Sequence, residues 1–140
     1  MTFYSRSTQH AVILLAYIAK LREGELCSVR DVSLATGISE PTTAKTLQIL
    51  VKEGILGSKK GPGGGFFLAT SPERVSLAMI QRAVEGKVLF IDCIAGLGPC
   101  HADNVCSIHE KWQSARRTVI DFMESVTLRE LALATKRLKD

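Results

Sequence analysis

A chain of 140 residues with 46% hydrophobic side chains is long enough for one folded domain and too apolar to be intrinsically disordered. Its longest apolar run, at residues 11–19, is too short to cross a bilayer, and no signal-peptide pattern precedes it, so we expect a cytoplasmic protein with no membrane partner. The formal net charge of +4 permits nucleic-acid binding but does not by itself argue for it.

The first part of the chain is predicted to contain three helices. Residues 5–21 have the apolar pattern of a helix that is buried on most sides. Ser28 has the chemistry of an N-cap for a short second helix, which Gly37 ends. Ser39 is the predicted N-cap of a third helix, with Pro41 in its first turn. Two short helices that meet across a tight turn predict a helix-turn-helix, although generic two-helix hairpins share this pattern.

A short hairpin is predicted directly after the third helix. Residues 55–58 and 65–69 have the pattern of two strands, and a glycine-rich segment with two lysines joins them. Glycines allow positive φ and close approach of the backbone to a surface, and lysines supply positive charge for phosphates. After a helix-turn-helix, we interpret this hairpin as the wing of a winged helix. The alternative is a flexible surface loop with two solvated lysines.

The second half of the chain is predicted to be helical on both sides of a loop. Ser71 opens a helix that runs to Gly86, and residues 87–104 form an ordered loop. A long helix then carries apolar residues spaced alternately three and four apart, and residues 127–138 form a further amphipathic helix. The apolar stripe consists of Val105, Ile108, Trp112, Ala115, Val119, Phe122 and Val126. We favour the seam of a homodimer over internal core packing, because a chain this short has few other faces that would cover it.

Together the elements predict a mainly α fold with a small two-stranded β wing. We expect residues 1–86 to form a winged helix-turn-helix domain, residues 87–106 a cysteine loop and residues 105–140 dimerisation helices. The first helix is expected to contribute to both the DNA-binding domain and the dimerisation part. In such a dimer, two recognition helices would read the half-sites of a palindromic operator in double-stranded DNA. The chain shows no nucleophile–base pair, and residues 61–65 lack the Lys-Ser/Thr of a phosphate-binding loop, so we do not expect an enzyme.

Three of the four cysteines lie close together, at Cys93, Cys100 and Cys106. In a reducing cytoplasm such a group is more often a metal or redox site than a disulfide framework. Thiolates suit iron–sulfur clusters and zinc alike, but the C-x6-C-x5-C spacing is wider than that of zinc knuckles. Cys27 lies apart from the other three, near the start of the second helix, and is predicted to be structural.

Several motifs now coincide: Ser5-Arg6 through His10-Ala11-Val12, Gly37-Ile38-Ser39, Lys60-Gly61-Pro62-Gly63-Gly64-Gly65-Phe66, and the three cysteines. With them the chain resembles, over nearly its whole length, the Rrf-type winged-helix transcriptional regulators, a family that includes iron–sulfur sensors of the IscR and NsrR kind. The resemblance implies a DNA-binding regulator, expected to be a repressor. Its operator affinity would be controlled by an iron–sulfur cluster, [2Fe-2S] or [4Fe-4S], that senses redox state, nitric oxide or iron. The first gap between cysteines is one residue longer here than is usual in the family.

The resemblance also assigns DNA contacts to individual residues. Ser39, Thr42 and Lys45 are expected to face DNA from the recognition helix, opposite a core face that includes Leu47 and Leu50. The alternative for this polar side is a solvated helix face. The remaining expected DNA contacts are Ser5, Arg6, Lys59, Lys60, Gly61, Gly63, Gly64 and Gly65.

The expected cluster ligands are the three clustered cysteines and His109, which matches the histidine of IscR-like members. The alternative for His109 is an ordinary surface histidine. Other members use an acidic residue of the partner's first helix, where this chain has Gln9, a poor ligand. His101 and His10 are further candidates for the fourth ligand.

Two other interpretations stay open at this point. One keeps the DNA-binding dimer and makes the cysteines a thiol switch that forms disulfides without a metal. The other is a small iron–sulfur electron carrier, which predicts no operator binding and leaves the wing without a purpose.

Overall fold

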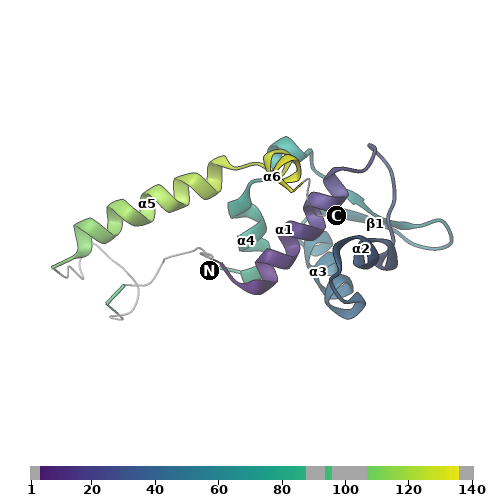
Figure 1. Ribbon diagram of the computed structural model, residues 1–140, viewed down its shortest axis with the longest axis horizontal. Coiled ribbons are helices and arrows are strands. Elements are labelled where there is room, and N and C mark those ends of the chain that lie inside the picture. The colour runs from purple at the N-terminus through teal and green to yellow at the C-terminus, as the bar shows by residue number, and fades with distance from the viewer. Residues whose placement is uncertain (1–3, 88–93, 96–106, 136–140) are drawn as a thin grey trace.

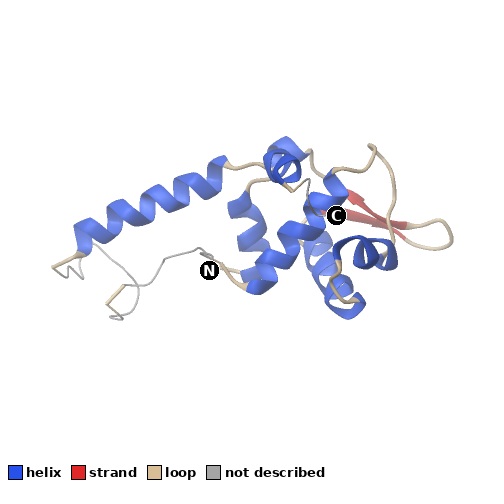
Figure 2. Cartoon of the chain, viewed as in Figure 1, coloured by secondary structure: helices blue, strands red, loops and turns tan. Residues whose placement is uncertain are grey.

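The computed structural model describes residues 4–87, 94–95 and 107–135. Within these ranges the chain forms six α-helices, one 3-10 helix and one two-stranded antiparallel sheet (Figure 2). Their order is α1 (Arg6–Ala19), α2 (Val29–Thr36), α3 (Glu40–Lys52), β1 (Leu56–Lys59), β2 (Gly65–Leu68), η1 (Pro72–Arg74), α4 (Leu77–Glu85), α5 (His109–Ser125) and α6 (Leu128–Ala134). The predicted fold class, mainly α with a small β wing, is confirmed.

Helix α1 lies at the centre of the core because its sequence is apolar on most sides. Leu14 and Leu15 are completely buried, and α1 contacts α2, α3, α4, α6 and β2 (Figure 1). The same buried hydrophobic cluster includes Val32 of α2 and Leu47 and Leu50 of α3. None of the helices in the described ranges is both long and apolar enough to span a membrane.

The segment after the wing differs from the single helix predicted over residues 71–86. It forms the short helix η1, then Val75 in an extended conformation, and only then α4. The carbonyl of Val75 accepts the N–H of Leu128 (2.7 Å), and the N–H of Leu77 donates to the carbonyl of Val126 (2.9 Å). These bonds to a segment about fifty residues away hold the backbone extended where a helix would otherwise continue.

The two C-terminal helices differ in how they pack. Helix α6 lies against α1 and η1 and buries Leu128 and Ala132 in the core. Helix α5 contacts α4 and extends away from the remaining helices (Figure 1), and Met123 is its only buried residue. The predicted start of the long helix near Val105 and the end of the tail helix at residue 138 lie outside the described residues.

Candidate nucleic-acid interface

The turn between α2 and α3 is held by hydrogen bonds from both helices. Gly37 ends α2 in the left-handed conformation with φ 76°, which favours glycine. The carbonyl of Ile38 accepts the hydroxyl of Ser33 in α2 (2.6 Å) and the hydroxyl of Thr43 in α3 (3.3 Å). Because both helices bond to the same carbonyl, their relative orientation is constrained, as a helix-turn-helix requires.

Helix α3, the predicted recognition helix, has a buried face and an exposed face. Ser39 and Lys45 are exposed, and Thr42 is half-buried. Ser39 caps the helix: its hydroxyl accepts the N–H of Thr42 (3.4 Å) and donates to the hydroxyl of Thr42 (3.0 Å). The buried side chains are Thr43, Thr46, Leu47 and Leu50. The three predicted DNA contacts therefore lie off the core face, and their contact with DNA stays a prediction.

The exposed side of α3 includes more residues than the three predicted from the sequence to face DNA. Pro41, Gln48 and Lys52 are also exposed, and together with Lys45 they are spaced alternately four and three residues apart. This spacing places them on one side of the helix. Extending the helical spacing forward and backward from Lys45 would have identified them in the sequence.

The wing is an antiparallel hairpin that extends beyond the helices (Figure 2). Its pairing runs from Leu56 opposite Leu68 to Lys59 opposite Gly65. Lys59 and Lys60 are exposed where the hairpin leaves the paired region. In the tip, Gly61 and Gly63 have positive φ of 88° and 75°, a conformation that most other residues avoid.

Two further wing glycines are required by close approach within the protein itself. A Cβ atom on Gly65 would lie 2.6 Å from the carbonyl oxygen of Cys27, and one on Gly64 would collide with the carbonyl oxygen of Lys59. From the sequence, these glycines are predicted to contact DNA. The structure adds an internal reason for them, and their DNA contact stays a prediction.

Cys27 connects the wing to the start of α2. Its N–H donates to the carbonyl of Phe66 (3.1 Å), and its carbonyl accepts the N–H of Phe66 (2.8 Å). The residue is 3% exposed, and burial, with smaller contributions from Asp31 and Glu25, raises the pKa of its thiol to about 11. A protonated thiol is a weak nucleophile, which agrees with the predicted structural role.

The start of α1 is fixed by Ser5 and by the end of α4. The hydroxyl of Ser5 accepts the N–H of Thr8 (3.2 Å) and so caps the helix. The Glu85 carboxylate accepts the hydroxyl of Thr8 (2.6 Å) and the N–H of Ser5 (3.3 Å). Ser5, a predicted DNA contact, therefore also has a structural role, while the neighbouring Arg6 is exposed.

Most of the predicted cluster ligands lie outside the described residues, namely Cys93, Cys100, Cys106 and His101. His109 is the first residue of α5 and is half-buried, whereas Gln9 and His10 lie in α1. Within the described ranges, no group of three or more His, Cys, Asp or Glu side chains is arranged to hold a metal ion. The ligand set therefore stays a prediction.

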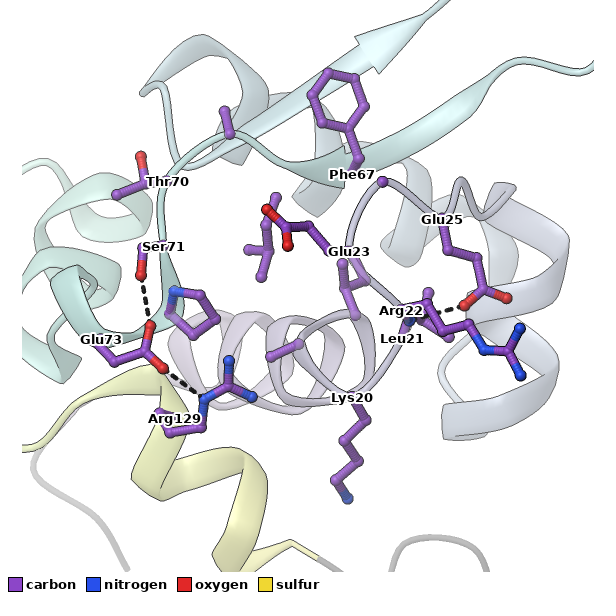
Figure 3. A pocket seen from close by; sticks show the side chains of 16 residues that line it. Lys20, Leu21, Arg22, Glu23, Glu25, Phe67, Thr70, Ser71, Glu73 and Arg129 are labelled. Carbon is purple, nitrogen blue, oxygen red and sulfur yellow. Dashed lines mark hydrogen bonds and ion pairs between the residues drawn. The ribbon is translucent and has the colours of Figure 1, made fainter.

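A cleft of about 570 Å³ lies between the α1–α2 connection, β2, η1 and α6 (Figure 3), and the sequence did not predict it. The Glu73 carboxylate accepts the hydroxyl of Ser71 and the Nε–H of Arg129, the latter at 2.8 Å. These two hydrogen bonds lower the pKa of Glu73 to about 2. The ion pair thus joins η1 to α6 at the edge of the cleft.

Comparison with known proteins agrees with this architecture. The model of the Rrf2 family, described as iron-dependent transcriptional regulators, matches residues 4–134. An Aquifex aeolicus protein named as an HTH-type transcriptional regulator is 32% identical over 130 residues, which are 91% of this chain and 90% of that protein. The HTH-type transcriptional regulator IscR of Vibrio cholerae is 28% identical over 131 residues, 94% of this chain and 75% of that protein.

Solved structures share the fold. CymR, the global cysteine regulator of B. subtilis, has a TM-score of 0.79 at 22% identity, covering 96% of this chain and 98% of that one. T. potens IscR has a TM-score of 0.74 at 20% identity, covering 97% and 90%. The family match, together with the helix-turn-helix and its wing, shows that this chain belongs to the Rrf2 family of transcriptional regulators.

Proposed function

We propose that this protein is a cytoplasmic repressor that binds a palindromic operator as a homodimer and whose operator affinity is controlled by an iron–sulfur cluster. The observation that carries the DNA-binding part is the combination of an exposed polar side on α3 with a hairpin whose exposed Lys59 and Lys60 follow that helix. Short side chains such as Ser39 and Thr42 favour phosphate contacts and modest base recognition.

Exposed apolar side chains on α5 support the homodimer. Phe122 is 54% exposed and Ile108, directly before the helix, is 43% exposed. Trp112 and Val119 are only half-buried. All four belong to the heptad stripe predicted for a dimer seam. A second copy of α5 would cover this stripe, and it would relate the two recognition helices by a two-fold axis.

The sensing part of the proposal rests on the sequence and the family. The cluster, a redox-active anionic group, would be held by Cys93, Cys100, Cys106 and His109. His109 is the first residue of α5, where the positive end of the helix dipole favours an anionic group. A change at these ligands would shift α5 and with it the spacing of the two recognition helices. A coupling of about 1–3 kcal/mol would change operator affinity roughly 5–150-fold.

A thiol switch without a cluster is the second candidate. Cys27 is poorly suited to it, because burial raises the pKa of its thiol to about 11 and keeps it protonated at neutral pH. Such a switch would therefore use the three clustered cysteines, the same residues as the cluster. The two candidates differ in whether iron and sulfide are bound.

Anaerobic purification with an absorption spectrum and with iron and acid-labile sulfide counts separates these candidates. We expect a coloured dimer that loses its colour, but stays folded, when Cys93, Cys100 or Cys106 is replaced by Ala. The Cys27→Ala variant, which alters a cysteine outside the group, should keep iron and sulfide and serves as the matched control. Stoichiometric iron and sulfide in each of the three variants would contradict the cluster assignment, and disulfides without iron would favour the thiol switch.

DNA binding is tested with an operator selected from random duplexes by the wild-type protein. The Lys59→Gln/Lys60→Gln variant should weaken binding and reduce the slope of log affinity against log salt by about one for each lost phosphate contact. Lys111→Gln, which removes an exposed lysine from α5, is the control. A cluster protein that selects no DNA would instead be an electron carrier.

A further inference from the structure

A pocket of about 310 Å³ lies between the start of α1 and the recognition helix α3. Arg6, Ser7 and His10 of α1 line one side of it, and Thr42 and Lys45 of α3 line the other. No acidic residue lines this pocket. Two cationic side chains from different helices therefore meet at one concave site, which is the electrostatic pattern of an anion site.

The polar groups around the pocket are mostly donors. Thr42 already accepts the hydroxyl proton of Ser39 (3.0 Å), so its own hydroxyl proton is directed elsewhere. An imidazole presents at least one N–H in either protonation state, so His10 donates whether neutral or charged. Arg6 and Ser7 are the first two residues of the 14-residue α1, where backbone N–H groups lack helical acceptors and the dipole is positive.

The carboxylate that contacts this end of α1 is already engaged in hydrogen bonds. Glu85 accepts hydrogen bonds from Thr8 (2.6 Å) and from the backbone of Ser5 (3.3 Å). It closes the joint between α1 and α4 and does not line the pocket. The positive charges of Arg6 and Lys45 are therefore not balanced by an acid within the pocket lining.

The pocket adjoins the start of α1, so the position of that end of the helix relative to the wing indicates which side of α3 it is on. In Figure 1, the start of α1 and the wing appear on opposite sides of α3. A DNA duplex whose major groove receives α3 would present sugar–phosphate backbone on both sides of the helix. With α3 in the groove, we expect the wing lysines to lie toward one of these backbones and the pocket toward the other.

We infer that this pocket binds a backbone phosphate of the operator, and that His10 is a DNA-contacting residue rather than a metal ligand. The inference rests on the proposed DNA-binding function and deepens it. It unites Arg6, Thr42 and Lys45, predicted separately as DNA contacts, into one site, and it adds Ser7 and His10. A phosphodiester is the expected occupant because the pocket adjoins the exposed stripe of the recognition helix.

The test compares wild type with Arg6→Gln, His10→Gln and Lys45→Gln for binding to the selected operator over a range of salt concentrations. Arg6→Gln and Lys45→Gln should each weaken binding about tenfold and lower the salt slope, by about one when both are replaced, because they share one phosphate. His10→Gln should weaken binding about threefold to tenfold. Its effect should be less than additive with that of Arg6→Gln, since both act on the same phosphate. Lys111→Gln, which removes an exposed lysine from α5 rather than from the recognition helix, is the matched control for charge.

Folding and cluster content serve as independent readouts. The three variants should keep the wild-type thermal midpoint and the wild-type iron and sulfide content, since neither fold nor ligands are altered. If His10→Gln loses iron and keeps its DNA affinity, His10 is a cluster ligand and the inference is wrong. Unchanged affinity and salt slope in all three variants, with binding still dependent on Lys59 and Lys60, would also overturn it while leaving the proposed function intact.

Competition with inorganic phosphate shows whether the pocket binds a phosphodiester of DNA or a free phosphate ion. At matched ionic strength, free phosphate should compete only weakly with operator binding, because one phosphate lacks the other contacts of the duplex. If phosphate raises the thermal midpoint of the wild type but not of His10→Gln, and the variants bind DNA normally, the pocket serves a free anion. A wild type that selects no DNA at all would instead remove the proposed function itself.

Discussion

The winged-helix part of the molecule and helix α5 bury their apolar side chains in different ways. Around α1, one chain supplies all the covering elements, and residues such as Leu15 and Leu47 are completely buried. On α5 only Met123 is buried, and Phe122 stays 54% exposed. The first region is complete within one chain, whereas the second carries an apolar stripe that the described part of the chain leaves partly open to solvent.

This difference separates two kinds of interaction that a helical pattern alone does not distinguish. A helix covered by its own chain contributes to the free energy of unfolding. An uncovered apolar helix contributes to association with another molecule, and its sequence has the same three-and-four spacing. Substitutions in the two regions should therefore change different measured quantities.

The largest effect should come from the core of the winged-helix part. Leu47→Ala in α3 removes a completely buried side chain and should lower the free energy of unfolding by about 2–5 kcal/mol. Leu34→Ala in α2 is the matched control, because Leu34 is 75% exposed, and should change it by less than about 0.5 kcal/mol. Urea denaturation at fixed protein concentration measures both. Equal losses in the two variants would contradict the core assignment.

The next largest effect should appear in association. Burying a whole phenylalanine side chain stabilises by about 1.5–3 kcal/mol. Since Phe122 is about half exposed, Phe122→Ala should cost about 0.8–1.5 kcal/mol in each protomer. The dimer dissociation constant should then rise about 14- to 140-fold, as measured by sedimentation equilibrium. Lys111→Ala on the same helix is the control, and an unchanged dissociation constant for Phe122→Ala would place the seam elsewhere.

Features with local physical causes were predictable from the sequence. The capping hydroxyls of Ser28 and Ser39, the left-handed Gly37 and the apolar pattern of α1 each act within a few residues, and all four lie where predicted. The wing was predictable because its strands adjoin in sequence and glycine permits its tip conformation.

Features that depend on distant partners were not predictable. The segment around Val75 is extended because its backbone forms hydrogen bonds with residues 126–128, and Cys27 pairs with Phe66. No local sequence pattern predicts either of these long-range pairings. Likewise, the candidate phosphate pocket joins residues of α1 and α3 that lie about 35 positions apart in the chain. His10 is one histidine in an apolar helix in the sequence, and only the packing of α1 against α3 places it beside Lys45.

A smaller effect on stability should come from the contact between the wing and the start of α2. Gly65→Ala places a Cβ atom 2.6 Å from the carbonyl oxygen of Cys27, at φ 153°, and should cost about 1–3 kcal/mol of stability. The paired Phe66 N–H should then exchange with solvent faster. Gly61→Asn, at a positive φ with open space around it, is the control and should leave that exchange rate unchanged. Slow exchange in both variants would show that the bond to Cys27 does not support the wing.

The smallest effect on stability should come from the ion pair between Arg129 of α6 and Glu73 of η1. The pKa of Glu73 is lowered to about 2 in the folded protein, first by the hydroxyl of Ser71 and then by Arg129. Because the unfolded chain binds the proton more readily, this contribution to stability is complete above about pH 4.5 and is lost as the pH falls toward 2. The side chains of Arg129 and Glu73 are 45% and 57% exposed, so solvent screening keeps the effect small.

Glu73→Gln should therefore lower the thermal midpoint slightly at pH 7, and the difference from wild type should shrink between pH 4.5 and pH 2. Glu23→Gln, on the same cleft (Figure 3), is the control because Glu23 has no ion pair within the described part of the chain. Thermal melts of the three proteins across this pH range measure the effect. If both variants show the same pH dependence, the Glu73–Arg129 pair does not stabilise the contact between η1 and α6.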